Sequence, residues 1–414
     1  MIETLSEPIA ITATAVVPTT RTFLPYFEGL RGFLSLIVGL THLWYMLSML
    51  RPAAFPLPAH FSAIGYSTVA VFVVTSGYVL GLPVARAAQT FAGGLRTYAR
   101  RRALRILPAY YAALLLSMPI STFCASVFHE GLTKHQFFIS ALLHLFMLQN
   151  VSNRLLASID GPMWSIAMEC DIYLLFPLLL VPFARRFGFV PMVASAFAVG
   201  LVPALIGALR HHITDYHFAY TSPWYIGMFA LGYAAANLSV DPDAITVRRF
   251  ERWPWGLLAV IFTAAMLVAV ASTTHQSYQK PLSDILIGLA IAAQFTANAR
   301  ARKRGRTTRF AHFCSWRPFL FLGTFSYSYI LIHIPIMELV LAAVRASWTN
   351  TQVLSAAALA LLAGLLAAYV FYRFIERRFL TAYRRRGDEA SLRSTRVLEI
   401  TDAGQVAAAS GHAA

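Results

Sequence analysis

Apolar stretches of about twenty residues recur along the chain and alternate with short polar segments. They cover residues 31–50, 64–84, 106–124, 164–183, 189–209, 223–239, 255–273, 282–299, 319–340 and 352–375. Each is close to the ~17–25 residues that a helix needs to cross the hydrocarbon core. A shorter apolar run, 137–150, lies between Lys134 and Arg154. The pattern predicts an all-α polytopic membrane bundle of about ten transmembrane helices plus one short or re-entrant helix.

The basic residues set the predicted orientation of these helices. If ten spans cross, both termini lie inside and 137–150 does not cross, then 28 of the 34 Lys and Arg residues fall in inside segments. Cytoplasmic loops are enriched in Lys and Arg, so both termini are predicted to be cytoplasmic. A full crossing by 137–150 would move every later loop to the other side and remove most of this bias. That segment is therefore expected to pack within the protein.

Composition excludes several classes of protein. With 58% hydrophobic and 13% charged residues, the chain is too apolar for a soluble domain. Its net charge of +16 comes from short clusters between apolar runs, so no nucleic-acid partner is expected. The three isolated cysteines have no metal-ligand spacing. We expect an N-terminal cytoplasmic segment (1–26), one membrane domain (27–380) and a disordered cytoplasmic tail (381–414).

Ionisable residues inside apolar spans are the first functional candidates, because they are costly there. Arg31 and His42 are separated by nearly three whole helical turns, so they share a face and lie about 16 Å apart along the axis. An arginine at the cytoplasmic end can hold an anion, and a histidine at mid-depth can move protons. The alternative for His42 is a hydrogen bond to a neighbouring helix.

Three further segments carry candidate chemistry. Arg102 and Arg105, one turn apart at the cytoplasmic mouth of the third span, suit a polyphosphate or are an ordinary topogenic cluster. In the span at 164–183, Glu169 and Asp171 point in different directions, and Glu169 is favoured as the site residue over a solvated carboxylate. His333 lies near mid-membrane beside Pro335 and competes with His42 for the role of catalytic base. Its alternative role is to support helix packing or a kink at the proline. For His144, in the short element, a structural role is preferred.

Together and in this order, the segments resemble acyltransferase family 3, the integral-membrane O-acyltransferases of the O-antigen and Nod-factor acetylase type. The resemblance runs from about Phe27 to Phe379. Its markers are Gly29-Leu-Arg31-Gly with His42, Phe72-Val-Val-Thr-Ser76-Gly77-Tyr-Val-Leu, Arg102-x-x-Arg105 with Ile106-Leu-Pro108-Ala-Tyr110, Trp164-Ser165-x-x-x-Glu169-x-x-x-Tyr173, Ser326-Tyr-Ser-Tyr-Ile-Leu-Ile-His333 and Glu376-Arg377. The chain departs from the family pattern at Ala70, Cys170 and Arg378. Its Ser-Gly-Tyr-Val-Leu variant is similar to the branch that includes macrolide-acylating members.

The resemblance implies transfer of an acyl group, most often acetyl, from acyl-CoA to a hydroxyl of a glycan, glycolipid or glycosylated metabolite. It implies a cytoplasmic-membrane enzyme with acyl-CoA as co-substrate, no permanently bound cofactor and no metal. The roles it implies are catalytic for His42, Glu169 and His333, donor-binding for Arg31, Arg102 and Arg105, and acceptor-binding for Trp164, Ser165 and Tyr173.

A different reading of the same residues is a proton-coupled transporter of an amphipathic or anionic solute, because intramembrane His, Glu and Arg also build such carriers. The chain shows no internal repeat and no matching pair of broken helices, which disfavours a carrier. A membrane sensor is a weaker alternative. Hydrolysis of acyl-CoA by the purified protein would separate the enzyme from both.

The charge distribution makes a testable prediction of topology. A reporter fused at Arg304 should read cytoplasmic, and one fused at Lys280 should read extracytoplasmic, because the intervening span crosses the membrane. If both fusions report the same side, the ten-span arrangement is wrong.

Overall fold

The computed structural model describes residues 24–58, 61–128, 133–152, 154–209, 223–240, 249–272 and 276–380. These residues form helices and connecting segments, with no strand among them, so the all-α prediction is confirmed for the described part of the chain. The predicted disordered tail and most of the N-terminal segment lie outside the described residues.

Long helices make up most of the fold. The first half contains α1 (Pro25–Leu50), α2 (Phe61–Arg86), α3 (Gly94–Phe128), α4 (Lys134–Leu145), a short 3₁₀ helix (Gln149–Val151), α5 (Met163–Leu175), a π-helical turn (Phe176–Leu180), α6 (Val181–Phe187) and α7 (Phe189–Leu209). The second half contains α9 (Tyr225–Val240), α11 (Trp255–Ser272), α12 (Gln276–Lys303), α13 (Arg309–Cys314), α14 (Arg317–Thr324), α15 (Ser326–Leu341), α16 (Asn350–Phe371) and a second π-helical turn (Tyr372–Glu376).

Seven of the described helices are long and apolar enough to cross a membrane, and an eighth span results if α14 and α15 are one broken crossing. The predicted spans at 189–209 and 223–239 contain shorter apolar helices, Phe189–Val202 and Tyr225–Val240. The chain is thus a multi-pass membrane protein, and the count of ten crossings stays a prediction.

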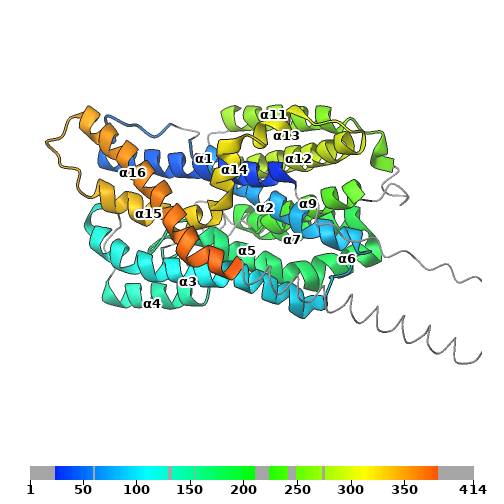
Figure 1. Cartoon of the computed structure of the whole chain (residues 1–414), viewed down its shortest axis with the longest axis horizontal. Helices are drawn as coiled ribbons and strands as arrows, with labels where there is room; N and C mark the ends of the chain where they lie inside the picture. The colour runs from blue at the N-terminus through cyan, green and yellow to red at the C-terminus, as the bar shows by residue number, and fades with distance from the viewer. Residues whose placement is uncertain are drawn as a thin grey trace, which may run out of the picture.

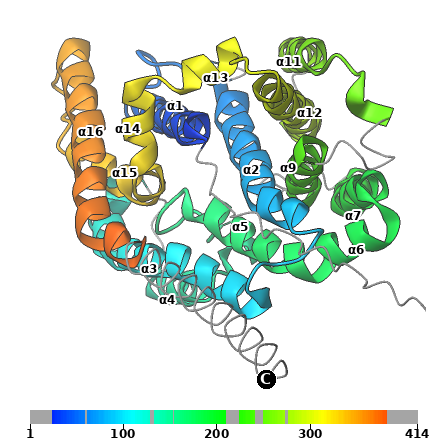
Figure 2. The same ribbon diagram turned by 45° about the vertical axis from the view of Figure 1, so that its right-hand side comes forward.

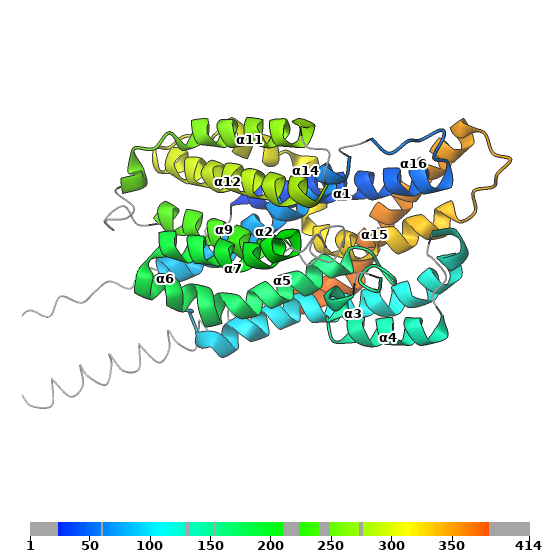
Figure 3. The same cartoon turned by 180° about the vertical axis from the view of Figure 1, so that it is seen from behind.

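The bundle is built around α1 and α2 (Figures 1 and 2). Helix α1 packs against α14 and α15, and α2 packs against α9 and α12. Seen from behind, α3 and α5 run along the lower side of the molecule, with α4 below α3 (Figure 3). Helices from distant parts of the sequence therefore surround one interior.

The segment at 137–150 is short, as predicted, but it is not enclosed. Helix α4 has 12 residues and is therefore only about 18 Å long, too short to cross the hydrocarbon core. It lies at the edge of the bundle beside α3, and Phe138 is 62% exposed. The expectation that it packs within the protein was wrong, because its apolar side chains extend the outer surface that lipid would cover.

The predicted span at 319–340 is a bent pair of helices. Helices α14 and α15 meet at Phe325 with a bend of 76°. Ser326 begins the second helix and donates its hydroxyl to the Gly323 carbonyl at 3.1 Å. The bend lets α14 cross over α1 while α15 turns into the interior, where most of its residues are buried.

Close backbone contact fixes α2 against α9. A Cβ atom on Gly77 would lie 2.1 Å from the Phe229 carbonyl oxygen, and one on Gly232 would lie 2.0 Å from the Val74 carbonyl oxygen. Small residues at helix interfaces allow this approach in membrane proteins. Because the obstructing atoms belong to backbone, they cannot rotate away.

Gly232→Ala should therefore lower the thermal stability of the purified protein, by an overpacking cost of about 1–3 kcal/mol. Gly256→Ala on the exposed helix α11 is the matched control, since nothing lies within 4 Å of its added Cβ. The control should unfold at or slightly above the wild-type temperature. Equal stability of all three proteins would contradict the close contact.

Candidate active site

An internal cavity of about 890 Å³ lies among α1, α2, α3, α5 and α15. Its lining includes all the predicted site residues except His333: Arg31, His42, Arg102, Arg105, Trp164, Ser165, Glu169 and Tyr173. On α1 the lining extends from Glu28 to Met49, about 32 Å of helix. This length is close to the ~30 Å hydrocarbon core, so the cavity extends through most of the membrane thickness.

The two candidate histidines form one unit. His42 Nδ1 lies 2.8 Å from His333 Nε2, so the two rings meet edge to edge, with centroids 5.1 Å apart and planes inclined by 23°. His333 is fully buried, and the Tyr329 ring lies nearly parallel to it at a centroid distance of 4.8 Å. His42 therefore meets the cavity, while His333 supports it from behind. The two histidines, competing candidates from the sequence alone, are hydrogen-bonded partners in the structure.

The hydrogen bonds of His333 determine which nitrogen of His42 can act as a base. His333 Nδ1 lies 2.7 Å from the Tyr329 carbonyl oxygen, which can only accept, so this nitrogen carries the hydrogen. In neutral imidazole the other nitrogen then accepts, and His42 Nδ1 is the donor to it. The Nε2 atom of His42 is left with a lone pair. The arrangement therefore gives one residue of the cavity wall a proton-accepting nitrogen.

Glu169 belongs to a separate polar cluster. Ser76 donates to Glu169 Oε1 at 2.6 Å, and the Tyr173 hydroxyl donates to the same oxygen and contacts Ser76 Oγ at 3.2 Å. These hydrogen-bond partners of Glu169 come from α2 and α5 and do not include His42. Glu169 lines the cavity, whereas Asp171 is exposed and is not part of the lining. Ser76 appeared in the sequence analysis only as a motif residue.

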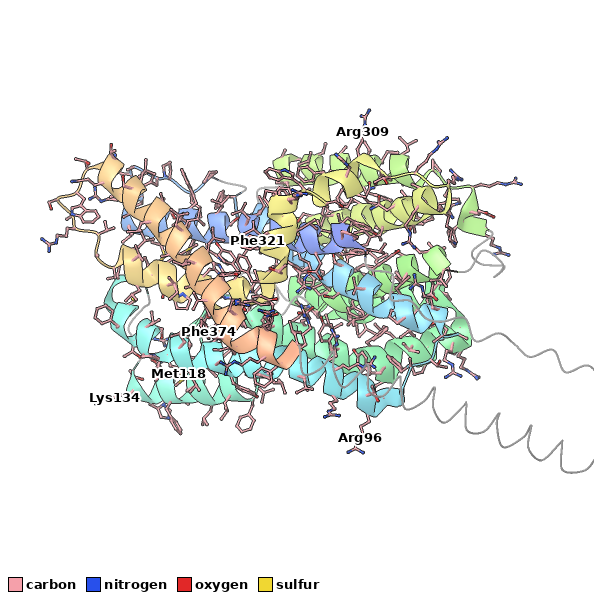
Figure 4. The ribbon with its side chains drawn as sticks, in the orientation of Figure 1. Arg96, Met118, Lys134, Arg309, Phe321 and Phe374 are labelled. Atoms are coloured by element: carbon pink, nitrogen blue, oxygen red, sulfur yellow. The ribbon has the colours of Figure 1, made fainter. Side chains whose placement is uncertain are left out.

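Arginines gather at one end of the cavity, which we call the arginine end: Arg31 from α1, with Arg101, Arg102 and Arg105 from α3. The Arg102 guanidinium lies 5.9 Å from the centre of the Tyr173 ring, next to the Glu169 cluster. Arg101 was not singled out from the sequence. By contrast, Arg96 and Arg309 project outward from the bundle (Figure 4). Converging guanidinium groups of this kind suit an anion with several phosphates.

His144 has a structural environment, as preferred from the sequence. It is buried, its Nδ1 atom lies 2.9 Å from the Ser140 carbonyl oxygen, and its own carbonyl accepts from the Tyr110 hydroxyl at 2.9 Å. The bond from Tyr110 holds α4 against α3. His144 is not part of the cavity lining.

A multi-pass helical bundle with arginine, histidine and glutamate side chains along an interior cavity is the architecture of a membrane-embedded enzyme or of a carrier. The model of acyltransferase family 3, described as an acyltransferase domain, matches residues 24–373, and the chain belongs to this family. The protein is therefore a membrane transferase that moves acyl groups. Searches of curated proteins and of solved structures find no match to the chain.

Proposed function

We propose that the protein transfers an acyl group, most simply acetyl, from acyl-CoA to a hydroxyl of a glycan, glycolipid or glycosylated metabolite. The observation that carries the proposal is the placement, in one cavity, of an arginine end and a histidine with a proton-accepting nitrogen. An acyl-CoA donor needs both a phosphate-binding surface and a base for the attacking hydroxyl.

The arginine end would hold the donor. Arg31, Arg102 and Arg105 would bind the phosphates of CoA, and the narrow pantetheine arm would extend along the cavity toward His42. The helical rise puts His42 about 16 Å from Arg31 along α1, so the phosphates and the reacting thioester occupy different depths. Arg31 at this distance binds the donor and does not contact the reacting carbonyl.

His42 would act as the general base. Its Nε2 atom takes the hydroxyl proton as the acceptor oxygen attacks the thioester carbon. The new C–O bond forms, the C–S bond breaks, and the CoA thiolate leaves and recovers the proton from His42. His333 accepts the hydrogen bond from His42 Nδ1 throughout, so it holds the productive tautomer and stabilises the imidazolium. The Glu169 cluster, with Ser76 and Tyr173, would shape the adjacent wall, with Trp164 and Ser165 nearby on α5.

We further propose ten crossings with both termini in the cytoplasm. Helices α7 and α9 would complete the count, because each contains an apolar helix that is only slightly short for a span. In this orientation the start of α1 and the arginine end face the cytoplasm, where acyl-CoA is available. The protein would then reside in the cytoplasmic membrane of the cell, with the lipid bilayer as its solvent.

The proposal is tested by acyl-CoA turnover in purified protein reconstituted in lipid nanodiscs. Release of free CoA from acetyl-CoA, to water or to an added hydroxyl acceptor, should depend on His42. A proton-coupled carrier would leave acetyl-CoA intact. Turnover that is absent under all acceptor conditions, or equal in wild type and His42→Ala, would contradict the proposal.

The histidine pair gives a graded prediction. His42→Ala should lower turnover by about 10²–10⁴-fold, the usual cost of losing a general base, while leaving CoA binding near normal. His333→Ala should also lower it, and His333→Gln should keep more activity, because the amide oxygen can still accept from His42 Nδ1.

His312→Ala, at an exposed histidine on α13, is the control and should behave as wild type. The pH–rate profile should fall on the acid side, since an imidazolium has no lone pair to accept a proton. If His42→Ala keeps most of its turnover while His333→Ala loses it, the base has been assigned to the wrong histidine.

Donor binding gives an independent prediction. Arg105→Ala should weaken acyl-CoA binding by on the order of 1.5–3 kcal/mol, the worth of a hydrogen bond to a charged group. Arg96→Ala, on the same helix but exposed, is the matched control. Calorimetric titration of the folded protein with CoA measures both. Unchanged affinity in Arg102→Ala and in Arg105→Ala would retire the phosphate-binding role.

A further inference from the structure

The cavity has a second end, opposite the arginines, to which the mechanism above assigns nothing. Its marker is Glu338 of α15, five residues beyond His333 and so about 7.5 Å farther along that helix. On α3 the same direction leads from Arg105 to Phe128, which also lines the cavity, about 34 Å away along the axis. We call this region the glutamate end.

Glu338 lies within electrostatic range of a second carboxyl group, Asp160. Glu338 is 4% exposed and lines the cavity, and it acts electrostatically on Asp160 and on Cys124 of α3. Asp160 is fully buried behind the wall, where Ser117 donates to its Oδ2 atom at 3.1 Å. Its Oδ1 atom has no hydrogen-bond partner among the described residues. The glutamate end therefore presents the Glu338 carboxyl group to the cavity, whereas the other end presents four arginines together with Glu28 and Glu169.

Apart from this carboxyl group, the wall of the glutamate end is largely apolar and aromatic. Its side chains come from α1, α2, α3 and α5 and include Tyr45, Met49, Phe61, Phe128 and Trp164. Binding sites for apolar bodies have this composition, with a few polar groups that fix orientation. A free hydrophilic glycan would find few partners for its many hydroxyl groups here, and each unmatched hydroxyl costs free energy.

We propose that the glutamate end binds the acyl acceptor and that the acceptor is an amphipathic glycoside. Its apolar body lies against the aromatic wall, and a hydroxyl or amine of its sugar donates a hydrogen bond to Glu338. The reacting hydroxyl then lies at His42, between the two ends of the cavity. This inference rests on the proposed function and narrows its acceptor from any hydroxyl-bearing glycan to one that carries an apolar body.

The binding step can be tested without acyl transfer. The probe is a dodecyl maltoside with a diazirine in its alkyl chain, cross-linked to the protein in nanodiscs and mapped by mass spectrometry. Cross-links are expected at Tyr45, Phe61 and Phe128. Unlabelled dodecyl maltoside should compete for these sites, whereas maltose, which has the same sugar without the chain, should not.

Glu338→Gln should weaken the competition by about tenfold, the effect of removing a charged hydrogen-bond acceptor. Glu251→Gln, at an exposed glutamate, is the matched control and should compete as the wild type does. A diazirine probe with a phosphocholine head reports adventitious lipid contacts and should label only the outer surface.

Three results would overturn the inference. They are competition by maltose equal to that by dodecyl maltoside, labelling confined to outer surfaces such as α11, and unchanged competition in Glu338→Gln. The assay uses no acyl-CoA, so its outcome is independent of the turnover test. Cavity labelling without His42-dependent turnover would retire the proposed function, and turnover without cavity labelling would retire only the acceptor site.

Discussion

The hydrogen bond between His42 and His333 is the interaction on which the site depends. It joins α1 to α15 across 291 residues of sequence and fixes both rings in the interior of the bundle. Ionisable groups at this depth are costly unless they are hydrogen-bonded, and here the two rings form a hydrogen bond with each other. The Tyr329 carbonyl completes the chain of bonds and thereby selects the nitrogen that can accept a proton.

The bend at Phe325 makes this pairing possible. A straight helix through 319–340 would continue along α14 over the surface of α1, whereas the 76° turn sends α15 into the interior. Along α15, His333 then lies between Ser326 and Glu338, which both line the cavity. A single broken helix therefore connects the level of the arginines, the histidine pair and the glutamate end. The break at Phe325 interrupts the helix, and interrupted backbone inside a membrane is tolerated only within protein or beside water.

Much of this arrangement could be predicted from local sequence. Hydrophobic length gave the helices, and the helical period put Arg31 and His42 on one face, as their shared cavity shows. The contacts between helices could not be predicted, because no local period records which histidine meets which. The bend at Phe325 could not be predicted because the whole segment 319–340 has the length and hydropathy of one span. Ser76 could not be recognised as a partner of Glu169 because its helix, α2, precedes α5 by almost a hundred residues. The edge position of α4 could not be predicted either, because apolar side chains can pack equally well against lipid and against protein.

The central claim is that one cavity holds the acyl-CoA donor with its reacting carbon at the histidine pair. The most direct measurement is a cryo-electron microscopy structure of the protein in nanodiscs with a non-hydrolysable acetyl-CoA analogue. The account predicts the phosphates beside Arg31, Arg102 and Arg105, and the acyl carbon in the part of the cavity that His42 lines. Analogue density at the glutamate end, or outside the cavity, would contradict it.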